Sequence, residues 1–287
     1  MSRLILIFSI GLLLAPALTG AAETFRFTAI PDQNTARLEE RFSKVAAYLA
    51  EQLDIQVEYI PVKSYSASVA AFKNNEVQLA WFGGLSGVKA RLAVPGSQAI
   101  AQGEEDPQFV TYFIANAQTG IKAGKDFPAA IKGQTFTFGS KGSTSGRLMP
   151  EFFIREHFKA EPKKIFKRVG FSGDHSKTLA LVQSGSWAVG ALNYKVWHKE
   201  VEAGKVDTAK VNIIWKTPGY VDYNWTIRGD VEAKYGKGFI GKVRDALVGM
   251  KDEELLKSFP RASFIPADNA MYKPILDTAI EIGIIDK

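Results

Sequence analysis

The stretch FRFTAIPDQNTARLEERFSKVAAYLAEQLDIQVEY (residues 25–59) decides the fold class of this chain. It opens with alternating apolar and polar side chains, as in a half-buried strand, and PDQNT (31–35) then interrupts the alternation. Apolar residues next recur at steps of three or four, which is the period of an amphipathic helix, and residues 55–59 alternate again. Strand, helix and strand in this order predict a right-handed, parallel βαβ unit.

The same kind of pattern continues along the chain. Residues 65–73 are helix-like, and VQLAWFGG (77–84) has the composition of a buried strand that ends in glycines. Helical patterns separate the further expected strands, which lie near residues 109–115, 135–138 and 211–215. Alternating strands and helices predict an α/β protein.

Two polar segments rich in glycine or proline divide the chain. They lie near residues 118–126 and 218–223, and their composition is typical of domain crossings. Two crossings let the chain enter a second domain and return to the first. We therefore expect one lobe from residues 23–116 and 224–287, and a second lobe from residues 117–223.

Residues 1–22 have the composition of a secretory signal peptide. Arg3 gives a positive start, residues 4–17 are almost wholly apolar, and TGAA (19–22) supplies small residues for cleavage. The alternative is a membrane anchor, but the apolar run is shorter than the roughly 20 residues that span a bilayer. The chain has no cysteine, which excludes disulfides, thiolate metal sites and cysteine nucleophiles. We expect export to the bacterial periplasm.

The charge and the histidines exclude other kinds of partner. The net charge of +6 comes from dispersed residues, without the basic blocks or interleaved aromatics that bind nucleic acid. It indicates a mild preference for anions. His157, His175 and His198 have no metal-ligand spacing, so we expect no metal site.

The turn GSTSG (142–146) places three hydroxyl residues, Ser143, Thr144 and Ser145, between a strand-like run and a helix-like run. A helix N-terminus has unpaired backbone N–H groups and about half a positive charge, so it attracts anions. The glycines let the backbone come close, and three hydroxyl donors could surround a tetrahedral anion with neutral hydrogen bonds. The alternative is an ordinary Ser/Thr N-cap.

The start of the following helix also has two interpretations. Either the helix begins near Met149 with Pro150 at its first position, or Pro150 kinks a helix that began earlier.

Nucleotide and enzyme interpretations fit the glycine-rich segments less well. The turn lacks the Gly-Lys-Ser/Thr ending of a P-loop, and GKGFIG (236–241) follows helix-favouring residues. A Ser/His hydrolase is the stronger alternative, with the nucleophile in the turn and Asp174 and His175 as its partners. Thr144, however, stands where a nucleophile elbow needs serine. We expect a protein that is not an enzyme and uses no cofactor.

Three stretches resemble the periplasmic binding proteins of phosphonate, phosphate and phosphite ABC transporters: VQLAWFGGLSG (77–87), AAIKGQTFTFGSKGSTSG (129–146) and FSGDHSKTLALVQSGSWAVGALN (171–193). Their order and spacing match over nearly the whole mature chain, and the sequence is most similar to the selenate-type branch. The resemblance implies a two-lobe, type II-like fold that closes like a hinged clamp. It also implies a monomer that captures a tetrahedral oxyanion and delivers it to an inner-membrane permease.

The resemblance also implies the residues that hold the ligand. The three hydroxyl residues of the turn would grip the oxyanion, and His175 would donate a hydrogen bond to it from the same lobe. Tyr65 and Tyr112 match aromatic hydroxyl positions of the other lobe, although either could be a core residue, and His175 could lie in a surface loop. Trp81 ends a predicted strand, where ligands of open α/β sheets bind, with core packing as its alternative.

A departure from the family pattern concerns the substrate. Where phosphonate binders place carboxylates around an aminoalkyl tail, this chain has Asn193 and Tyr223, with Asp222 one residue away. A site of donors with few acceptors would penalise a ligand that carries an acidic proton, and fully ionised sulfate or selenate would escape that penalty. The expected ligand-binding residues are Tyr65, Trp81, Tyr112, Ser143, Thr144, Ser145, His175, Asn193, Asp222 and Tyr223.

Overall fold

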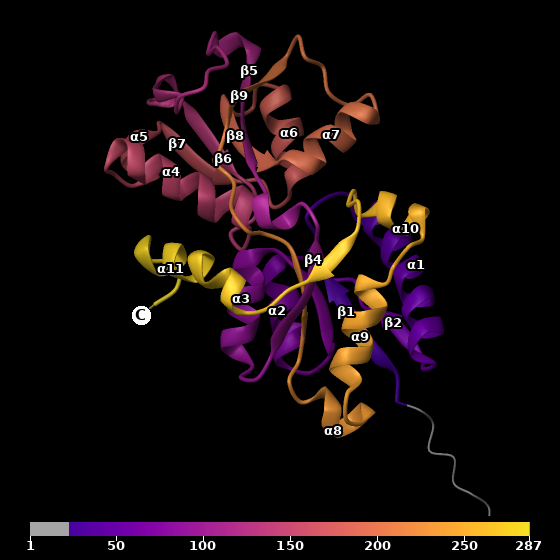
Figure 1. Ribbon diagram of the computed structural model, residues 1–287. Helices are drawn as coiled ribbons and strands as arrows, with labels where there is room; N and C mark the ends of the chain where they lie inside the picture. Colours follow the sequence, from indigo (N-terminus) through magenta and orange to yellow (C-terminus); the bar gives the residue numbers. More distant parts are fainter. Residues whose placement is uncertain (1–22, 287) are drawn as a thin grey trace, which may run out of the picture.

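The computed structural model describes residues 23–286, and the expected signal peptide lies outside them. The described chain forms two α/β lobes, one above the other in Figure 1, and each lobe is built on its own sheet with helices packed against it. The expected α/β class is confirmed. Between residues 23 and 286, no helix combines the length and the apolar character needed to cross a membrane.

The first sheet contains the predicted βαβ unit. Strands β1 (Phe25–Ala29) and β2 (Val57–Tyr59) are parallel neighbours and are joined by helix α1 (Thr35–Leu53). Asn34 begins α1, because its side chain accepts a hydrogen bond from the backbone N–H of Arg37 at 3.3 Å. The strand order is β11–β4–β10–β3–β1–β2, and the remaining strands are β3 (Leu79–Phe82), β4 (Gln98–Gly103), β10 (Asn224–Ile227) and β11 (Phe264–Pro266).

The second sheet has the strand order β7–β6–β8–β5–β9, in which β6 is parallel to both neighbours and β5 is antiparallel to both of its own. Its strands are β5 (Thr111–Asn116), β6 (Thr135–Phe138), β7 (Arg168–Phe171), β8 (Val189–Asn193) and β9 (Val211–Lys216). The lobe boundary expected at residue 116 is corrected by β5. Local alternation predicts that a strand forms, but its pairing with β8 and β9 decides the sheet to which it belongs.

The two chain crossings form a paired hinge. The first crossing lies at residues 104–110 and not at 118–126, and the chain returns at residues 217–223. Phe109 and Tyr220 exchange both backbone hydrogen bonds across the crossings, at 2.8 and 3.0 Å. The two crossings therefore support each other directly below the second lobe.

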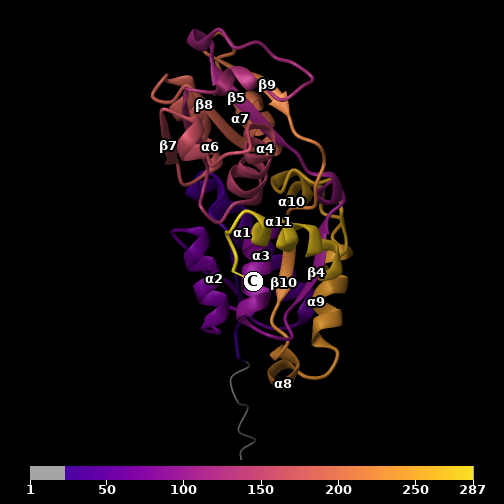
Figure 2. The ribbon, with the colours of Figure 1, turned by 90° about the vertical axis from the view of Figure 1, so that its left-hand side faces the viewer.

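Helices cover both lobes (Figures 1 and 2). In lobe 1 they are α1, α2 (Tyr65–Lys73), α3 (Gly84–Ala93), α8 (Val231–Tyr235), α9 (Phe239–Val248), α10 (Glu253–Ser258) and α11 (Lys273–Glu281). In lobe 2 they are α4 (Met149–Phe158), α5 (Pro162–Ile165), α6 (His175–Gln183) and α7 (Tyr194–Glu202). Short 3-10 turns occur at Asp106–Gln108, Ala117–Thr119, Ala129–Ile131 and Ala270–Tyr272. Figure 2 shows α11 near the level at which the lobes meet, where it contacts α3 and residues 144–148 of lobe 2.

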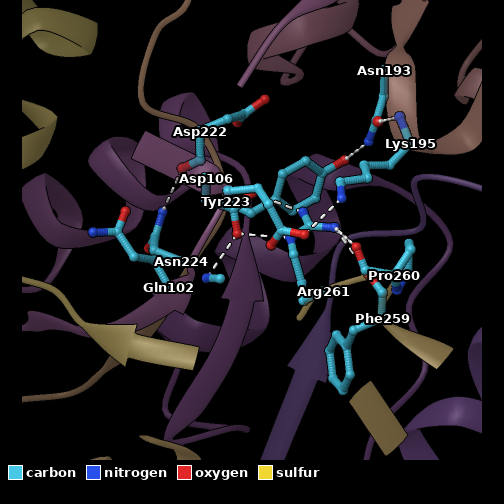
Figure 3. A network of polar contacts seen from close by, with 12 residues as sticks. Gln102, Asp106, Asn193, Lys195, Asp222, Tyr223, Asn224, Phe259, Pro260 and Arg261 are labelled. Carbon is cyan, nitrogen blue, oxygen red and sulfur yellow. Dashed lines mark hydrogen bonds and ion pairs between the residues drawn. The ribbon is translucent and has the colours of Figure 1, made fainter. Parts of the chain in front are cut away.

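A buried ion pair ties the first crossing to lobe 1. Arg261 donates to both carboxylate oxygens of Asp106, at 2.9 and 2.8 Å, and the backbone N–H of Gly103 donates to the same carboxylate at 2.8 Å. The two charged side chains are 3% and 0% exposed. Although burial alone would lower the pKa of Arg261, the Asp106 carboxylate raises it above its ordinary value. The charged pair is thus retained in the interior beside the hinge (Figure 3).

Replacing Arg261 should test the contribution of this pair to stability. We expect Arg261→Met to lower the free energy of unfolding by about 3 to 5 kcal/mol, because Asp106 is left as an uncompensated buried charge. Urea unfolding measures the change. Arg244→Met is the matched control: Arg244 and its partner Asp245 are both about half exposed or more, so its loss should cost less than about 1 kcal/mol. Equal losses in the two variants would contradict the expectation.

Candidate functional site

The hydroxyl turn leads through a π-helical turn (Thr144–Leu148) directly into α4. Ser143 caps this turn, since its Oγ accepts a hydrogen bond from the backbone N–H of Gly146 at 2.9 Å. Helix α4 begins at Met149 with Pro150 in its first turn, as one interpretation expected, although the π-helical turn before it means that the helical backbone already starts at Thr144. The N-cap interpretation is therefore correct for Ser143, and it leaves the other two hydroxyl residues for other contacts.

The turn is inserted between the lobes. Ser143, Thr144 and Ser145 are at most 2% exposed. The Oγ1 of Thr144 accepts a hydrogen bond from the backbone N–H of Leu85, at the start of α3 in lobe 1, at 3.0 Å. The lobes are thus closed on each other, and the start of α3 faces the turn. Both helix starts bring backbone N–H groups and a partial positive charge to this interface.

Four buried polar atoms near this turn have no hydrogen-bond partner among the described residues: Tyr65 Oη, Ser145 Oγ, His175 Nε2 and Asp222 Oδ2. Their residues are at most 2% exposed. Most buried polar atoms in proteins are hydrogen-bonded, and each one left unpaired costs about 1 to 3 kcal/mol. Four of them around one turn indicate a site for a small polar ligand that supplies the missing partners.

Tyr65 reaches the turn from lobe 1. It is the first residue of α2, and a Cβ at Gly142 would lie only 3.0 Å from the Cβ of Tyr65. Burial raises the pKa of Tyr65 well above its ordinary value, so the phenol keeps its proton. The hydroxyl is therefore available as a hydrogen-bond donor.

His175 reaches the turn as the first residue of α6. Its Nδ1 accepts a hydrogen bond from the backbone N–H of Asn193 at 3.2 Å, so in the neutral ring the proton is on Nε2. Burial lowers the pKa of His175 and keeps the imidazole neutral. A Cβ at Gly146 would lie 3.0 Å from Cε1 of this ring, so glycine allows the ring to approach the turn. His175 thus presents an N–H donor.

Asp222, one of the expected site residues, brings an acidic group to the turn. Its Oδ1 accepts a hydrogen bond from the backbone N–H of Gly84 at 2.8 Å. Burial raises the pKa of Asp222 to about 7, while interactions with the hydroxyls of Thr144 and Ser145 oppose the increase. The second carboxylate oxygen lies close to these hydroxyls without a well-aligned hydrogen bond, so the site combines three donors with one ionisable acceptor.

Tyr112 is not part of this arrangement. Its hydroxyl lies 3.1 Å from Nε2 of His198, away from the turn, and β5 belongs to lobe 2, not to lobe 1. The neighbouring Thr111 donates instead to the carbonyl oxygen of Ser145 at 2.8 Å, and its hydroxyl lies 2.5 Å from that of Tyr220. Successive residues of a strand point to opposite faces, so an assignment displaced by one residue selects the wrong face.

Trp81, Asn193 and Tyr223 lie behind the turn. Trp81 is 3% exposed and stacks on Tyr223, with ring centroids 5.4 Å apart, so core packing is its role. The Tyr223 hydroxyl donates to Asp32 at 2.8 Å and accepts from the Asn193 side chain at 2.9 Å. Figure 3 shows this hydroxyl pointing toward Asn193. The positions expected to surround a ligand tail are thus bonded to each other.

Two residues of this region were missed by the sequence analysis. Asp32 follows β1 within the PDQNT segment, and Thr111 begins β5. The available signal for Asp32 was its place just after a strand, since ligands of open α/β sheets bind beyond the carboxyl ends of strands. Thr111 had no signal apart from its adjacency to Tyr112.

The geometry argues against the hydrolase alternative. A catalytic histidine donates from Nδ1 to an acid and uses a free Nε2 to accept the serine proton. In His175 the Nδ1 is the acceptor, so Nε2 carries the proton and cannot act as that base. The Asp174 side chain accepts from the backbone N–H of Lys177 at 2.8 Å and caps α6 instead.

Comparisons with known proteins identify the family of this chain. The family model described as "ABC transporter, phosphonate, periplasmic substrate-binding protein" matches residues 27–272. A Prochlorococcus marinus protein described as "Probable ABC transporter phosphite binding protein" is 40% identical over 260 residues, which cover 86% of each chain. The phosphonates-binding periplasmic protein of Escherichia coli is 26% identical over 74% of this chain and 63% of its own length.

A solved structure of the Prochlorococcus marinus protein in complex with methylphosphonate superimposes with a TM-score of 0.86 and 38% identity, over 91% of this chain and 99% of that one. A phosphonate-transporter binding component from Pseudomonas aeruginosa has a TM-score of 0.78 at 20% identity, over 90% of this chain and 86% of that chain, and supports the fold alone. The two-lobe fold expected from the sequence is confirmed. The matched relatives are binding proteins and not enzymes, as expected.

Two serines of the turn should differ in their effects. Ser145→Ala should weaken oxyanion binding about 5- to 150-fold, because it removes a donor without a well-aligned partner in the chain, and it should change the stability of the ligand-free protein less than Ser143→Ala does. Ser143→Ala should instead lower that stability by about 1 kcal/mol through loss of the cap. Calorimetric titration and thermal unfolding measure the two effects. The same profile in both variants would contradict the assignment.

Asp222 should make the ligand-free protein less stable as the pH rises. Its pKa is about 7 in the folded chain against an ordinary value of 3.8, so between these values only the folded state holds the proton. Unfolding then releases a proton, and stability falls from about pH 4 to pH 7 by at most about 4 kcal/mol from this group.

Asp222→Asn should remove this pH dependence. The melting temperature of the variant minus that of the unmodified protein should therefore be more positive at pH 8 than at pH 5. Calorimetry without ligand measures this difference. A constant difference across this range would show that Asp222 does not titrate in this way.

Proposed function

Because this chain belongs to the family of periplasmic substrate-binding proteins of phosphonate ABC transporters, we propose that it captures a compact phosphonate- or phosphite-type oxyanion with an ionisable O–H group. The anion is held between the two lobes and delivered to a permease in the inner membrane. All the groups proposed to hold it come from one chain, so a monomer is sufficient for binding.

The observation that carries this proposal is the set of four unpaired atoms around the turn. Tyr65, Ser145 and His175 offer donors to the oxygens of a tetrahedral anion, and Asp222 offers an acceptor. A singly protonated oxyanion matches this set, since its bare oxygens accept hydrogen bonds and its O–H donates to the carboxylate. Neutral donors and oriented backbone dipoles can replace the hydration of such an anion in a closed site.

Asp222 also distinguishes between the two classes of ligand that the sequence left open, phosphonate-like anions and selenate- or sulfate-like anions. Sulfate and selenate are fully ionised near neutral pH and have no proton to donate, so an ionised Asp222 would face one of their oxygens with a like charge. Mismatched partners of this kind in a buried site reject a ligand strongly. We therefore favour a phosphonate or phosphite over the selenate-type ligand.

The relatives support a compact ligand. The Prochlorococcus marinus relative is described as a phosphite binding protein, and a structure of that organism's protein contains methylphosphonate. Both ligands are small tetrahedral oxyanions of phosphorus that can carry an O–H group.

Exchanging the acid for an amide should test the proposal. At pH 8 the unmodified protein should bind phosphite or methylphosphonate at least about 100-fold more tightly than sulfate or selenate. Asp222→Asn should reduce this preference at least about 10-fold, because an amide N–H can donate to a fully ionised anion. Calorimetric titration with the four anions measures the preference.

Asp245→Asn, at an exposed position of α9, is the control for this exchange and should leave every affinity unchanged. A preference that stays the same in Asp222→Asn would contradict the acceptor role. Failure of the unmodified protein to bind any of the four anions would overturn the proposed function itself.

A further inference from the structure

Four hydrogen bonds form a closed ring behind the imidazole of His175. The His175 backbone N–H donates to the carbonyl oxygen of Asp32 at 3.0 Å, and the Tyr223 hydroxyl donates to the Asp32 carboxylate at 2.8 Å. The Asn193 side chain donates to the Tyr223 hydroxyl at 2.9 Å. The backbone N–H of Asn193 completes the ring by donating to His175 Nδ1 at 3.2 Å.

The ring joins the two lobes. Asp32 belongs to lobe 1, next to β1, and Tyr223 is the last residue of the returning crossing, at the start of β10 in the same lobe. His175 and Asn193 belong to lobe 2, at the start of α6 and the end of β8. Two of the four bonds, from His175 to Asp32 and from Asn193 to Tyr223, therefore exist only when the lobes are closed. The bond to Nδ1 links the ring to the ligand site, because it leaves the proton on the Nε2 that faces the turn.

The ring is better placed to hold the lobes together than the ion pair at the rim of the cleft. All four ring residues are at most 4% exposed, so their hydrogen bonds are shielded from water. Arg37 and Glu200 also join the lobes, at 3.1 Å, but the Arg37 side chain is 30% exposed and its charge is partly screened.

The space beside this ring of hydrogen bonds is nearly filled by side chains. The cavity lined by Asp32, Asn193 and Tyr223 has a volume of about 10 Å³, and a single water molecule needs about as much. The Tyr223 ring is held by stacking on Trp81 and by the Arg261 guanidinium, 5.2 Å from its centroid. In the closed arrangement there is no room at this place for an alkyl chain.

We propose that Tyr223 and Asn193 are positioning residues that bond to each other across the cleft and couple capture of the ligand to closure of the lobes. Their contact also closes the space that an extended ligand tail would need. This inference rests on the proposed function and narrows its substrate class to oxyanions without a tail of two or more carbons.

Tyr223→Phe tests the coupling and keeps the aromatic ring in its stack. The change removes the bond to the Asp32 carboxylate in both states, but it removes the bond from the Asn193 amide in the closed state only. We expect the affinities for phosphite and methylphosphonate to fall by the same factor, about 10- to 100-fold. The loss should lie in faster dissociation, with the association rate changed less than about threefold, as measured by stopped-flow tryptophan fluorescence.

Tyr48→Phe is the matched control. The Tyr48 hydroxyl donates to the carbonyl oxygen of Ala246 at 2.7 Å, entirely within lobe 1, so the control also loses one tyrosine hydrogen bond. It should bind both anions as the unmodified protein does. Equal dissociation rates in Tyr223→Phe and Tyr48→Phe would overturn the coupling.

Asn193→Asp gives a second test that preserves the fold. The retained carboxylate oxygen can still cap α7, as the Asn193 Oδ1 does for the backbone N–H groups of Lys195 and Val196 at 2.7 and 3.3 Å. The donor to Tyr223 is lost. In the double variant with Tyr223→Phe, the combined loss of affinity should be smaller than the product of the two single losses, because both remove the same contact. Fully multiplicative losses would contradict the proposed contact.

The size limit is tested on the unmodified protein with 2-aminoethylphosphonate and phosphonoacetate, whose tails carry opposite charges. Both should bind at least about 100-fold more weakly than methylphosphonate. If either binds as tightly as methylphosphonate, the size limit is wrong while the proposed function stands. If no oxyanion binds at all, the proposed function fails.

Discussion

Buried polar groups require hydrogen-bond partners, and this requirement governs the interface between the two lobes. Within each lobe the strands and helices satisfy their own backbone groups, whereas the closed interface also buries side chains whose partners must come from elsewhere. Ser143 and Thr144 find partners in the chain, in Gly146 and Leu85. Ser145 has no well-aligned partner, and with Tyr65, His175 and Asp222 it forms the set of atoms that we propose a small oxyanion completes.

Two buried aspartates at the hinge differ in role because their surroundings differ. Asp106 is paired with Arg261 and holds the first crossing to lobe 1. Asp222, whose backbone N–H donates to the backbone carbonyl oxygen of Asp106 at 3.0 Å, has no cationic partner among the described residues. Burial therefore raises the pKa of Asp222 to about 7. A charged pair stabilises the scaffold, and an unpaired acid is available to a ligand that brings its own proton.

The arrangement also explains how one contact can serve both binding and closure. The neutral His175 is oriented by the backbone of Asn193, and the side chain of Asn193 reaches across the cleft to Tyr223. The donor offered to the ligand and the bond between the lobes therefore come from adjacent groups. Because the hinge crossings are paired at Phe109 and Tyr220, closure can move one lobe against the other with little change inside either.

Local sequence determined the elements of this protein and its central turn. The period of residues 25–59 is enough to specify the strand, helix and strand that form, and the three hydroxyls before α4 mark a helix start suited to an anion. These properties depend on neighbours a few residues apart. Only the tertiary structure decided that β5 belongs to the second sheet, that Thr111 and not Tyr112 meets the turn, and that Asp222 brings an acid to it. Strand pairing, the face a strand turns inward and contacts between lobes join residues far apart in the chain, so no local pattern encodes them.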